Sequence, residues 1–88
     1  MKSPLTKRIG MNICRLRGEI GWTQQELADE MDVDLTTVQR HESGRALPNA
    51  VDLYKLSLAL KVSMEELYHG LPRQIAEVSL LHPRKVHA

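Results

Sequence analysis

Apolar residues recur at intervals of three and four over the first twenty positions, which is the spacing of one helix face. The members of this series are Leu5, Ile9, Ile13, Leu16 and Ile20. Ser3 followed by Pro4 is typical of a helix start, because proline suits the first helical position. The pattern predicts a first helix that begins near these two residues and ends between Gly18 and Gly21.

A second helix is predicted to open at Thr23. The run from Thr23 to Glu26 has the form of a capping box, in which each of these two side chains accepts a hydrogen bond from the other residue's main-chain amide. The apolar face of this helix is formed by Leu27, Ala28 and Met31. A tight turn at Asp32 and Val33 is expected to end it.

Asp34 is expected to cap a third helix whose inward residues are Val38 and His41. Ser43 and Gly44 end this helix, since glycine readily adopts the left-handed conformation found after a helix C-terminus. Asn49, with Asp52 three residues later, marks the start of a fourth helix. Its predicted inward residues are Val51 or Leu53, then Leu56, Ala59 and Leu60.

A second capping box, Ser63 to Glu66, predicts a short fifth helix that runs through Leu67 and Tyr68 to Gly70. The remaining residues form a separate stretch between Pro72 and Pro83, with apolar residues at Ile75, Val78 and Leu81. We therefore divide the chain into a helical domain over residues 1–70 and a C-terminal extension over 71–88. The extension is predicted to be helical around 73–81 and frayed at its end.

Chain length and charge further limit the possible fold classes and functions. The 88 residues suffice for one all-α domain with a small core, and β-branched residues never alternate with polar ones over a strand's length. The net charge is only +1, but residues 1–22 carry five basic side chains against Glu19 alone, whereas residues 23–35 carry five acidic ones. Nucleic-acid binding needs a positive face rather than a positive total, so charge leaves this function open.

Several functions are not expected. The single Cys14 excludes an internal disulfide and a multi-cysteine zinc site, and it fits a reducing compartment. No signal peptide, membrane span, nucleophile–base pair or phosphate-binding glycine loop is apparent. We expect a cytoplasmic protein that is not an enzyme and has no metal and no cofactor. Cys14 is interpreted as an inert thiol, with a redox sensor as the alternative.

One joint pattern stands out from these separate signals. Counting from Gln24, a small residue (Ala28) stands at position five, the turn at position nine, and a β-branched residue (Val38) at position fifteen. Close crossing of two helices needs the small side chain, and Val38 holds the second helix against the first. These spacings are those of a helix-turn-helix over residues 23–44.

The chain also resembles a known family in several separated segments. These are Trp22 to Ala28, Val33, Thr37-Val38, Glu42 to Arg45, Pro48, and Leu56 through Leu60 to Ser63. They are similar to the lambda-repressor/Cro-type helix-turn-helix domains, the XRE family. The resemblance covers roughly residues 7–70. It implies a compact five-helix domain that binds operator DNA, usually as a dimer and mostly as a transcriptional repressor.

Two positions depart from that family. Asp32 stands where a turn glycine is usual, although aspartate tolerates the left-handed conformation better than most residues. Leu35 stands where related phage repressors have a glutamine that is braced by the glutamine at the start of the second helix. Sequence preference therefore cannot be transferred from those repressors.

The resemblance makes the third helix the recognition helix, which lies in the major groove of DNA. With Val38 inward, the candidates for reading bases are Leu35, Thr36, Gln39 and Arg40. Arginine can pair with guanine and glutamine with adenine through two hydrogen bonds, and Leu35 and Thr36 can contact a thymine methyl group. The alternative is a solvated polar face with one exposed leucine.

Backbone phosphates are expected to be bound at helix ends, where free amides attract anions. The candidates are Thr23, Gln24, Ser43 and Arg45. Thr23 has simple capping as an alternative or additional role. Lys7, Arg8 and Arg15 are weaker phosphate candidates or a solvated face. His41 is interpreted as a packed, hydrogen-bonded residue rather than a ligand, because no second His or Cys stands at metal spacing.

The resemblance also implies that Arg17 and Glu42 form a largely buried ion pair; the alternative is two separate surface charges. Double-stranded DNA and a second copy of the chain are the expected partners. The predicted dimer interface consists of Leu67, Leu71, Ile75, Val78 and Leu81. Alternatively, these tail residues fold back on the chain's own core, or the tail has no fixed structure.

Two other functions remain open. One is an antitoxin-type regulator whose tail binds a partner protein. The other is a protein-interaction module that has lost DNA binding. The second is suggested by the acidic residues Asp29, Glu30, Asp32 and Asp34, which would repel phosphate near the expected DNA face.

Overall fold

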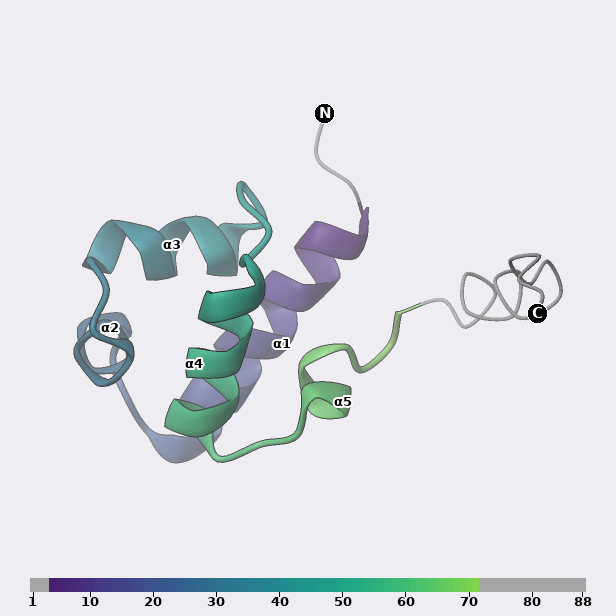
Figure 1. The fold of residues 1–88 in the computed structure, drawn as a ribbon. Helices are drawn as coiled ribbons and strands as arrows, with labels where there is room; N and C mark the ends of the chain where they lie inside the picture. The colour runs from purple at the N-terminus through teal and green to yellow at the C-terminus, as the bar shows by residue number, and fades with distance from the viewer. Residues whose placement is uncertain (1–3, 72–88) are drawn as a thin grey trace, which may run out of the picture.

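The computed structural model describes residues 4–71, and these form five α-helices joined by short connections (Figure 1). The helices are α1 (Pro4–Ile20), α2 (Gln24–Met31), α3 (Leu35–Ser43), α4 (Ala50–Leu60) and α5 (Met64–Leu67). The predicted all-α, five-helix architecture is confirmed. The predicted helix around 73–81, with Ile75, Val78 and Leu81, lies outside the described residues.

Local capping explains where most helices begin. Thr23 and Glu26 form the predicted capping box, and Ser63 and Glu66 form the second one. The Asn49 side chain accepts a hydrogen bond from the Asp52 amide at 2.8 Å, as expected. Each cap satisfies amides that the helix itself leaves without partners, so these starts could be read from short sequence segments.

Asp34 is an exception among the predicted caps. It occupies the N-cap position of α3, but its side chain accepts no hydrogen bond from the helix. The first turn is closed by the main chain, since the Thr37 amide donates to the Asp34 carbonyl oxygen at 2.9 Å. The Asp34 carboxylate is therefore exposed at the start of α3 rather than engaged as a cap.

The turn between α2 and α3 uses the left-handed conformation that a glycine would adopt easily. Asp32 has φ 58° and ψ 49°, and its amide donates to the carbonyl oxygens of Ala28 and Asp29. Gly44, with φ 78°, ends α3 in the same way. An aspartate tolerates this region at a modest cost, so the turn keeps its geometry without the usual glycine.

The core lies where α1, α2, α3, α4 and α5 meet. Its buried apolar members are Ile9, Ile13, Leu16, Leu27, Ala28, Met31, Val38, Leu56, Leu60 and Leu67. Ala28 is fully buried, as the close crossing of α2 and α3 requires. These side chains hold the helix-turn-helix against α1 and α4.

Three expectations about burial need correction. Ile20 is exposed, because the core-facing stripe of α1 ends one turn earlier at Leu16. On α4, Leu53 packs against the core and Val51 faces outward. Leu67 was expected at a dimer interface, but it is fully buried in the core of one chain and cannot reach a second copy. Leu71 also packs against this core.

A glycine that the sequence analysis did not single out sets the distance between α1 and α3. A Cβ atom at Gly10 would overlap the main-chain carbonyl oxygen of His41 and would lie 2.7 Å from that of Glu42. Because real Cβ atoms do not come this close to main-chain oxygens, any side chain here would push the two helices apart. Gly10 thus fixes how α3 is presented at the surface.

Candidate nucleic-acid interface

The outward face of α3 carries the side chains that were predicted to read bases. Val38 and His41 are buried, which turns Thr36, Gln39 and Arg40 toward solvent. Residues three and four apart share a helix face, so these three lie together near the N-terminal half of α3. Leu35 is the first residue of the helix and is half-buried. The four candidates therefore belong to one surface.

The two ends of the helix-turn-helix hold the predicted phosphate-binding residues. Ser43 is the exposed last residue of α3, where its hydroxyl donates to the Arg40 carbonyl oxygen at 3.2 Å, and Arg45 is exposed in the loop that follows. Thr23 is exposed at the start of α2, and its hydroxyl oxygen accepts from the Glu26 amide at 3.0 Å. This bond makes Thr23 the N-cap of α2.

Lys7 lies beside the end of α3. A Cβ atom at Gly44 would come within 2.9 Å of Lys7 Cγ, so the lysine stem packs directly against this glycine. Lys7 is exposed, and its position adds a cation next to Ser43 and Arg45. Sequence spacing could not reveal this proximity, because Lys7 belongs to α1.

Arg17 and Glu42 form the ion pair that was expected from the family resemblance. Arg17 Nε lies 2.6 Å from Glu42 Oε2, and Arg17 Nη2 donates to Glu42 Oε1 at 3.0 Å. The side chains are only 17% and 5% exposed. The hydrogen bond from Arg17 to Glu42 raises the pKa of the guanidinium, which outweighs the opposing effect of burial. The pair connects the end of α1 to the end of α3.

Two further hydrogen bonds extend this pair into a network. Arg17 Nη1 donates to the Trp22 carbonyl oxygen at 2.7 Å, and Gln24 Nε2 donates to Glu42 Oε1 at 2.9 Å. The side-chain amide of Gln24 is thus held by Glu42 on α3. This network positions the start of α2 relative to α3.

His41 is packed inward, as expected, but it is not fully hydrogen-bonded. Its Nε2 lies 3.6 Å from Asp52 Oδ2 on α4, and its buried Nδ1 has no hydrogen-bond partner among residues 4–71. Burial lowers the pKa of His41 from its ordinary value of 6.5, and the Asp52 carboxylate partly opposes this shift. His41 therefore links α3 to α4 as a neutral residue at pH 7.

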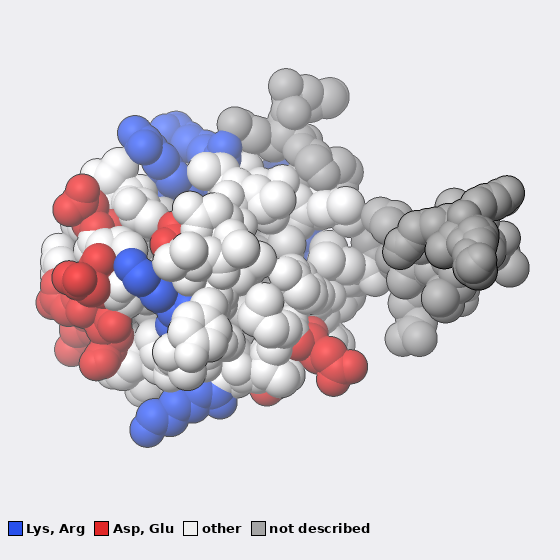
Figure 2. All heavy atoms as spheres, in the orientation of Figure 1, with Lys and Arg blue, Asp and Glu red and all other residues white. Residues whose placement is uncertain are grey.

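Acidic side chains gather around α2, next to the expected interface (Figure 2). The exposed members are Glu26, Asp29, Glu30, Asp32 and Asp34. Figure 2 also shows lysine and arginine side chains along the outer edge of α3. The acidic group around α2 would repel phosphates that approach that side of the helix-turn-helix.

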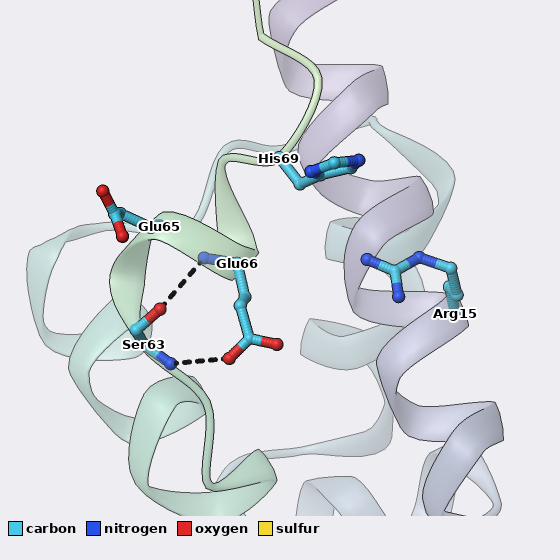
Figure 3. A pocket seen from close by; sticks show the side chains of 5 residues that line it. All are labelled: Arg15, Ser63, Glu65, Glu66 and His69. Carbon is cyan, nitrogen blue, oxygen red and sulfur yellow. Dashed lines mark hydrogen bonds between the residues drawn. The ribbon is translucent and has the colours of Figure 1, made fainter.

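No other part of the described chain forms a stronger candidate. A surface hollow lies between α1 and α5, lined by Arg15, Ser63, Glu65, Glu66 and His69 (Figure 3). Glu66 and Ser63 are already bonded to each other in the capping box. Within residues 4–71, no three His, Cys, Asp or Glu side chains gather as a metal site requires. No helix in this range is long and apolar enough to span a membrane.

Comparison with known proteins agrees with the helix-turn-helix arrangement of α2 and α3. A family model described as helix-turn-helix matches residues 14–67. The cryptic phage CTXphi transcriptional repressor RstR of Vibrio cholerae is 37% identical over 60 residues, which are 68% of this chain and 54% of RstR. Multiprotein-bridging factor 1 of Eremothecium gossypii is 37% identical over 68 residues, 77% of this chain and 45% of that protein. The chain spans about half the length of these two relatives.

A solved structure agrees in fold as well. The restriction-modification controller protein C.AhdI from Aeromonas hydrophila superposes with a TM-score of 0.69 at 28% sequence identity. The superposition covers 72% of this chain and 96% of that protein. The family match over residues 14–67 includes the whole α2–turn–α3 unit.

Proposed function

Because this chain belongs to the XRE-type helix-turn-helix family of transcriptional regulators, we propose that it binds specific double-stranded DNA sequences through α3. The observation that carries this proposal is the outward face of α3, where Thr36, Gln39 and Arg40 are exposed together. A helix with such a face fits the major groove, where each base pair presents a distinct pattern of donors and acceptors.

Each exposed side chain suits a different base contact. The Arg40 guanidinium can donate two hydrogen bonds to guanine, and the Gln39 amide can pair with adenine. Thr36 and Leu35 offer methyl groups to thymine. Around this face, Thr23, Gln24, Ser43 and Arg45 would contact phosphates and so fix the register of α3 in the groove.

We further propose that the protein represses transcription from a symmetric operator as a dimer. One recognition helix reads only a few base pairs, and two copies one helical turn apart double the length that is read. RstR, one of the relatives, is described as a transcriptional repressor. Such a protein would work in the cytoplasm with chromosomal or phage DNA.

A protein-interaction module is the second candidate function. The acidic side chains around α2 favour it, since they would repel phosphates on one flank of α3. Another relative carries the name multiprotein-bridging factor, which describes contacts with proteins. An antitoxin-type regulator, which binds a partner through the C-terminal extension, would combine both activities.

A salt titration separates these candidates. Binding of the full chain to a random-sequence duplex is measured by fluorescence anisotropy between ~50 and ~200 mM salt. A DNA-binding protein releases counterions, so log affinity should fall linearly with log salt, with a slope of about −0.9 per phosphate contacted. Absence of binding at the lowest salt, or affinity that does not depend on salt, would contradict the proposal and favour the interaction module.

A further inference from the structure

One residue at an N-cap position of the described chain does not act as a cap. Thr23, Asn49 and Ser63 each accept a hydrogen bond from the amide three residues later, at 3.0, 2.8 and 3.3 Å. Asp34 holds the same position at the start of α3, but the Thr37 amide donates to its carbonyl oxygen instead of its side chain. Within residues 4–71, the exposed Asp34 carboxylate accepts no hydrogen bond and forms no ion pair.

The position of Asp34 makes this free carboxylate part of the proposed DNA-binding face. A recognition helix turns its N-terminal residues toward the base edges of the major groove. Asp34 directly precedes Leu35 and Thr36, which are proposed to contact bases, and like Thr36 it is exposed. Arg40 follows six residues later on the same helix. The N-terminal end of α3 therefore presents an acceptor group next to the methyl groups of Leu35 and Thr36.

We propose that Asp34 selects cytosine in the major groove by accepting a hydrogen bond from the N4 amino group of the base. This inference rests on the proposed function, because it requires α3 in the major groove. An ionised carboxylate only accepts hydrogen bonds. Cytosine presents a donor in the major groove, whereas guanine presents two acceptors and thymine one. Adenine presents a donor with the acceptor N7 next to it, so cytosine is the base that a carboxylate fits best.

The negative charge of Asp34 adds to this selectivity. Phosphates and the acceptor edges of guanine and thymine repel a carboxylate, so a sequence that offers no donor at this position binds less tightly. The positive end of the α3 dipole partly offsets the charge of the carboxylate inside the groove. Asp34 belongs to the acidic residues that were expected to oppose DNA binding, and in this role it opposes binding mainly to the wrong sequences.

The distance along α3 predicts where the selected cytosine lies. Asp34 and Arg40 are six residues apart, which corresponds to ~9 Å along a helix that rises ~1.5 Å per residue. Neighbouring base pairs are spaced ~3.4 Å apart along one DNA strand. With the axis of α3 along the groove, Asp34 contacts a base pair about two to three positions from the one that Arg40 contacts. The two contacts can therefore be told apart in a selected DNA sequence.

The first test selects duplexes from a random pool with the wild-type full chain, Asp34→Asn and the matched control Asp32→Asn. Each substitution removes one negative charge. Asparagine is as good an N-cap residue as aspartate, and it tolerates the left-handed conformation of Asp32. The wild type should select cytosine at one fixed position, and Asp34→Asn should select adenine there, because an asparagine amide pairs with adenine N6 and N7. Asp32→Asn should select the wild-type motif.

A second test measures the dissociation constants of the same three proteins on four duplexes that differ only at this base pair. The wild type should bind the cytosine duplex about fivefold more tightly than the guanine and thymine duplexes, with a smaller margin over adenine. Asp34→Asn should bind the adenine duplex most tightly. Asp32→Asn should keep the wild-type order of the four duplexes. Circular dichroism and thermal unfolding of both variants check that the fold is retained.

The possible results separate this inference from the proposed function. The inference alone is wrong if Asp34→Asn selects the same motif as the wild type, or if it binds all four duplexes more tightly by one common factor. The second result would show that Asp34 acts only through its charge. The inference is also wrong if Asp32→Asn changes the same base preference as Asp34→Asn. If the wild type selects no motif at all, the proposed function fails and the inference fails with it.

Discussion

At the scale of single residues, substitution of Arg40 distinguishes a contact with a base from a contact with the DNA backbone most clearly. Arg40→Ala should cost about 1–3 kcal/mol on the preferred DNA sequence, because a bidentate contact to one base is lost. On random DNA the loss should be much smaller. The measurement is the dissociation constant of wild type and variant on both duplexes. Equal losses on the two would show that Arg40 contacts only phosphate.

Arg45 tests the backbone contacts. Arg45→Ala should weaken binding to all sequences similarly and reduce the slope of log affinity against log salt by about one. Lys61→Gly is the matched control, since it removes one cation from the other end of α4 at a position with φ 58°, which glycine adopts without strain. If both variants change the slope equally, the effect reflects total charge rather than a contact at Arg45.

His41 predicts a dependence of stability on pH. Burial lowers the pKa of His41 in the folded chain below its ordinary value of 6.5. As the pH falls from 6.5 towards this lower pKa, His41 takes up a proton in the unfolded chain but not in the folded chain. The free energy of unfolding should therefore decrease as the pH falls through this window, and the contribution of His41 should be fully present above it.

Urea unfolding at pH 7.5 and pH 5.5 measures this effect. His41→Asn should lose less stability than the wild type between these two pH values. Asp52→Asn should lose more, because the carboxylate that favours the protonated histidine is gone. An identical loss in all three proteins would assign the acid sensitivity to other groups.

At the scale of helices, Gly10 predicts a large effect from a single methyl group. Gly10→Ala should lower the free energy of unfolding and weaken DNA binding, because its Cβ would overlap main-chain oxygens of α3. Gly18 is the matched control on the same helix, since a Cβ there meets nothing within 4 Å. Gly18→Ala should instead stabilise the protein by about 0.5–1 kcal/mol through its higher helix propensity.

Thermal and urea unfolding of Gly10→Ala and Gly18→Ala measure whether the two substitutions change stability in opposite directions. Equal stability changes at the two positions would contradict the close approach of α1 and α3. A destabilised Gly10→Ala with unchanged DNA affinity would show that the α1–α3 distance does not control how α3 is presented.

The helices also show what the sequence could predict. The capping boxes at Thr23 and Ser63 depend on residues three apart, so short segments sufficed to place these starts. Whether Val51 or Leu53 faces the core depends on which helices pack against α4. The periodicity of the sequence alone does not give this information. Leu67 was misplaced for the same reason, since its burial arises from α1 and α4 rather than from its neighbours in sequence.

In the candidate site, too, some features could be predicted from helical periodicity and others required the folded structure. The outward positions of α3 followed from the inward position of Val38, which a helical period determines. The Arg17–Glu42 pair could be expected only from the family resemblance, since its members are 25 residues apart. The hydrogen bond from Gln24 to Glu42 and the contact of Lys7 with Gly44 required the folded chain.

At the scale of the whole molecule, three surfaces have separate chemistry. The α3 face exposes Arg40, the surroundings of α2 are acidic (Figure 2), and the outward side of α4 exposes the apolar residues Val51, Tyr54 and Leu58. The acidic surroundings of α2 would repel phosphates, so the proposed backbone contacts are expected on the flank of α3 near Lys7 and Arg45.

The most direct test of a DNA-reading α3 is selection of duplexes from a random pool by the full chain, followed by sequencing of the bound fraction. The account predicts a two-fold symmetric motif whose half-sites are centred one helical turn apart, ~34–36 Å along the duplex. Selection with Arg40→Ala should lose the preference at one base pair of each half-site and retain the rest. A bound fraction with the same sequence composition as the starting pool would contradict the account.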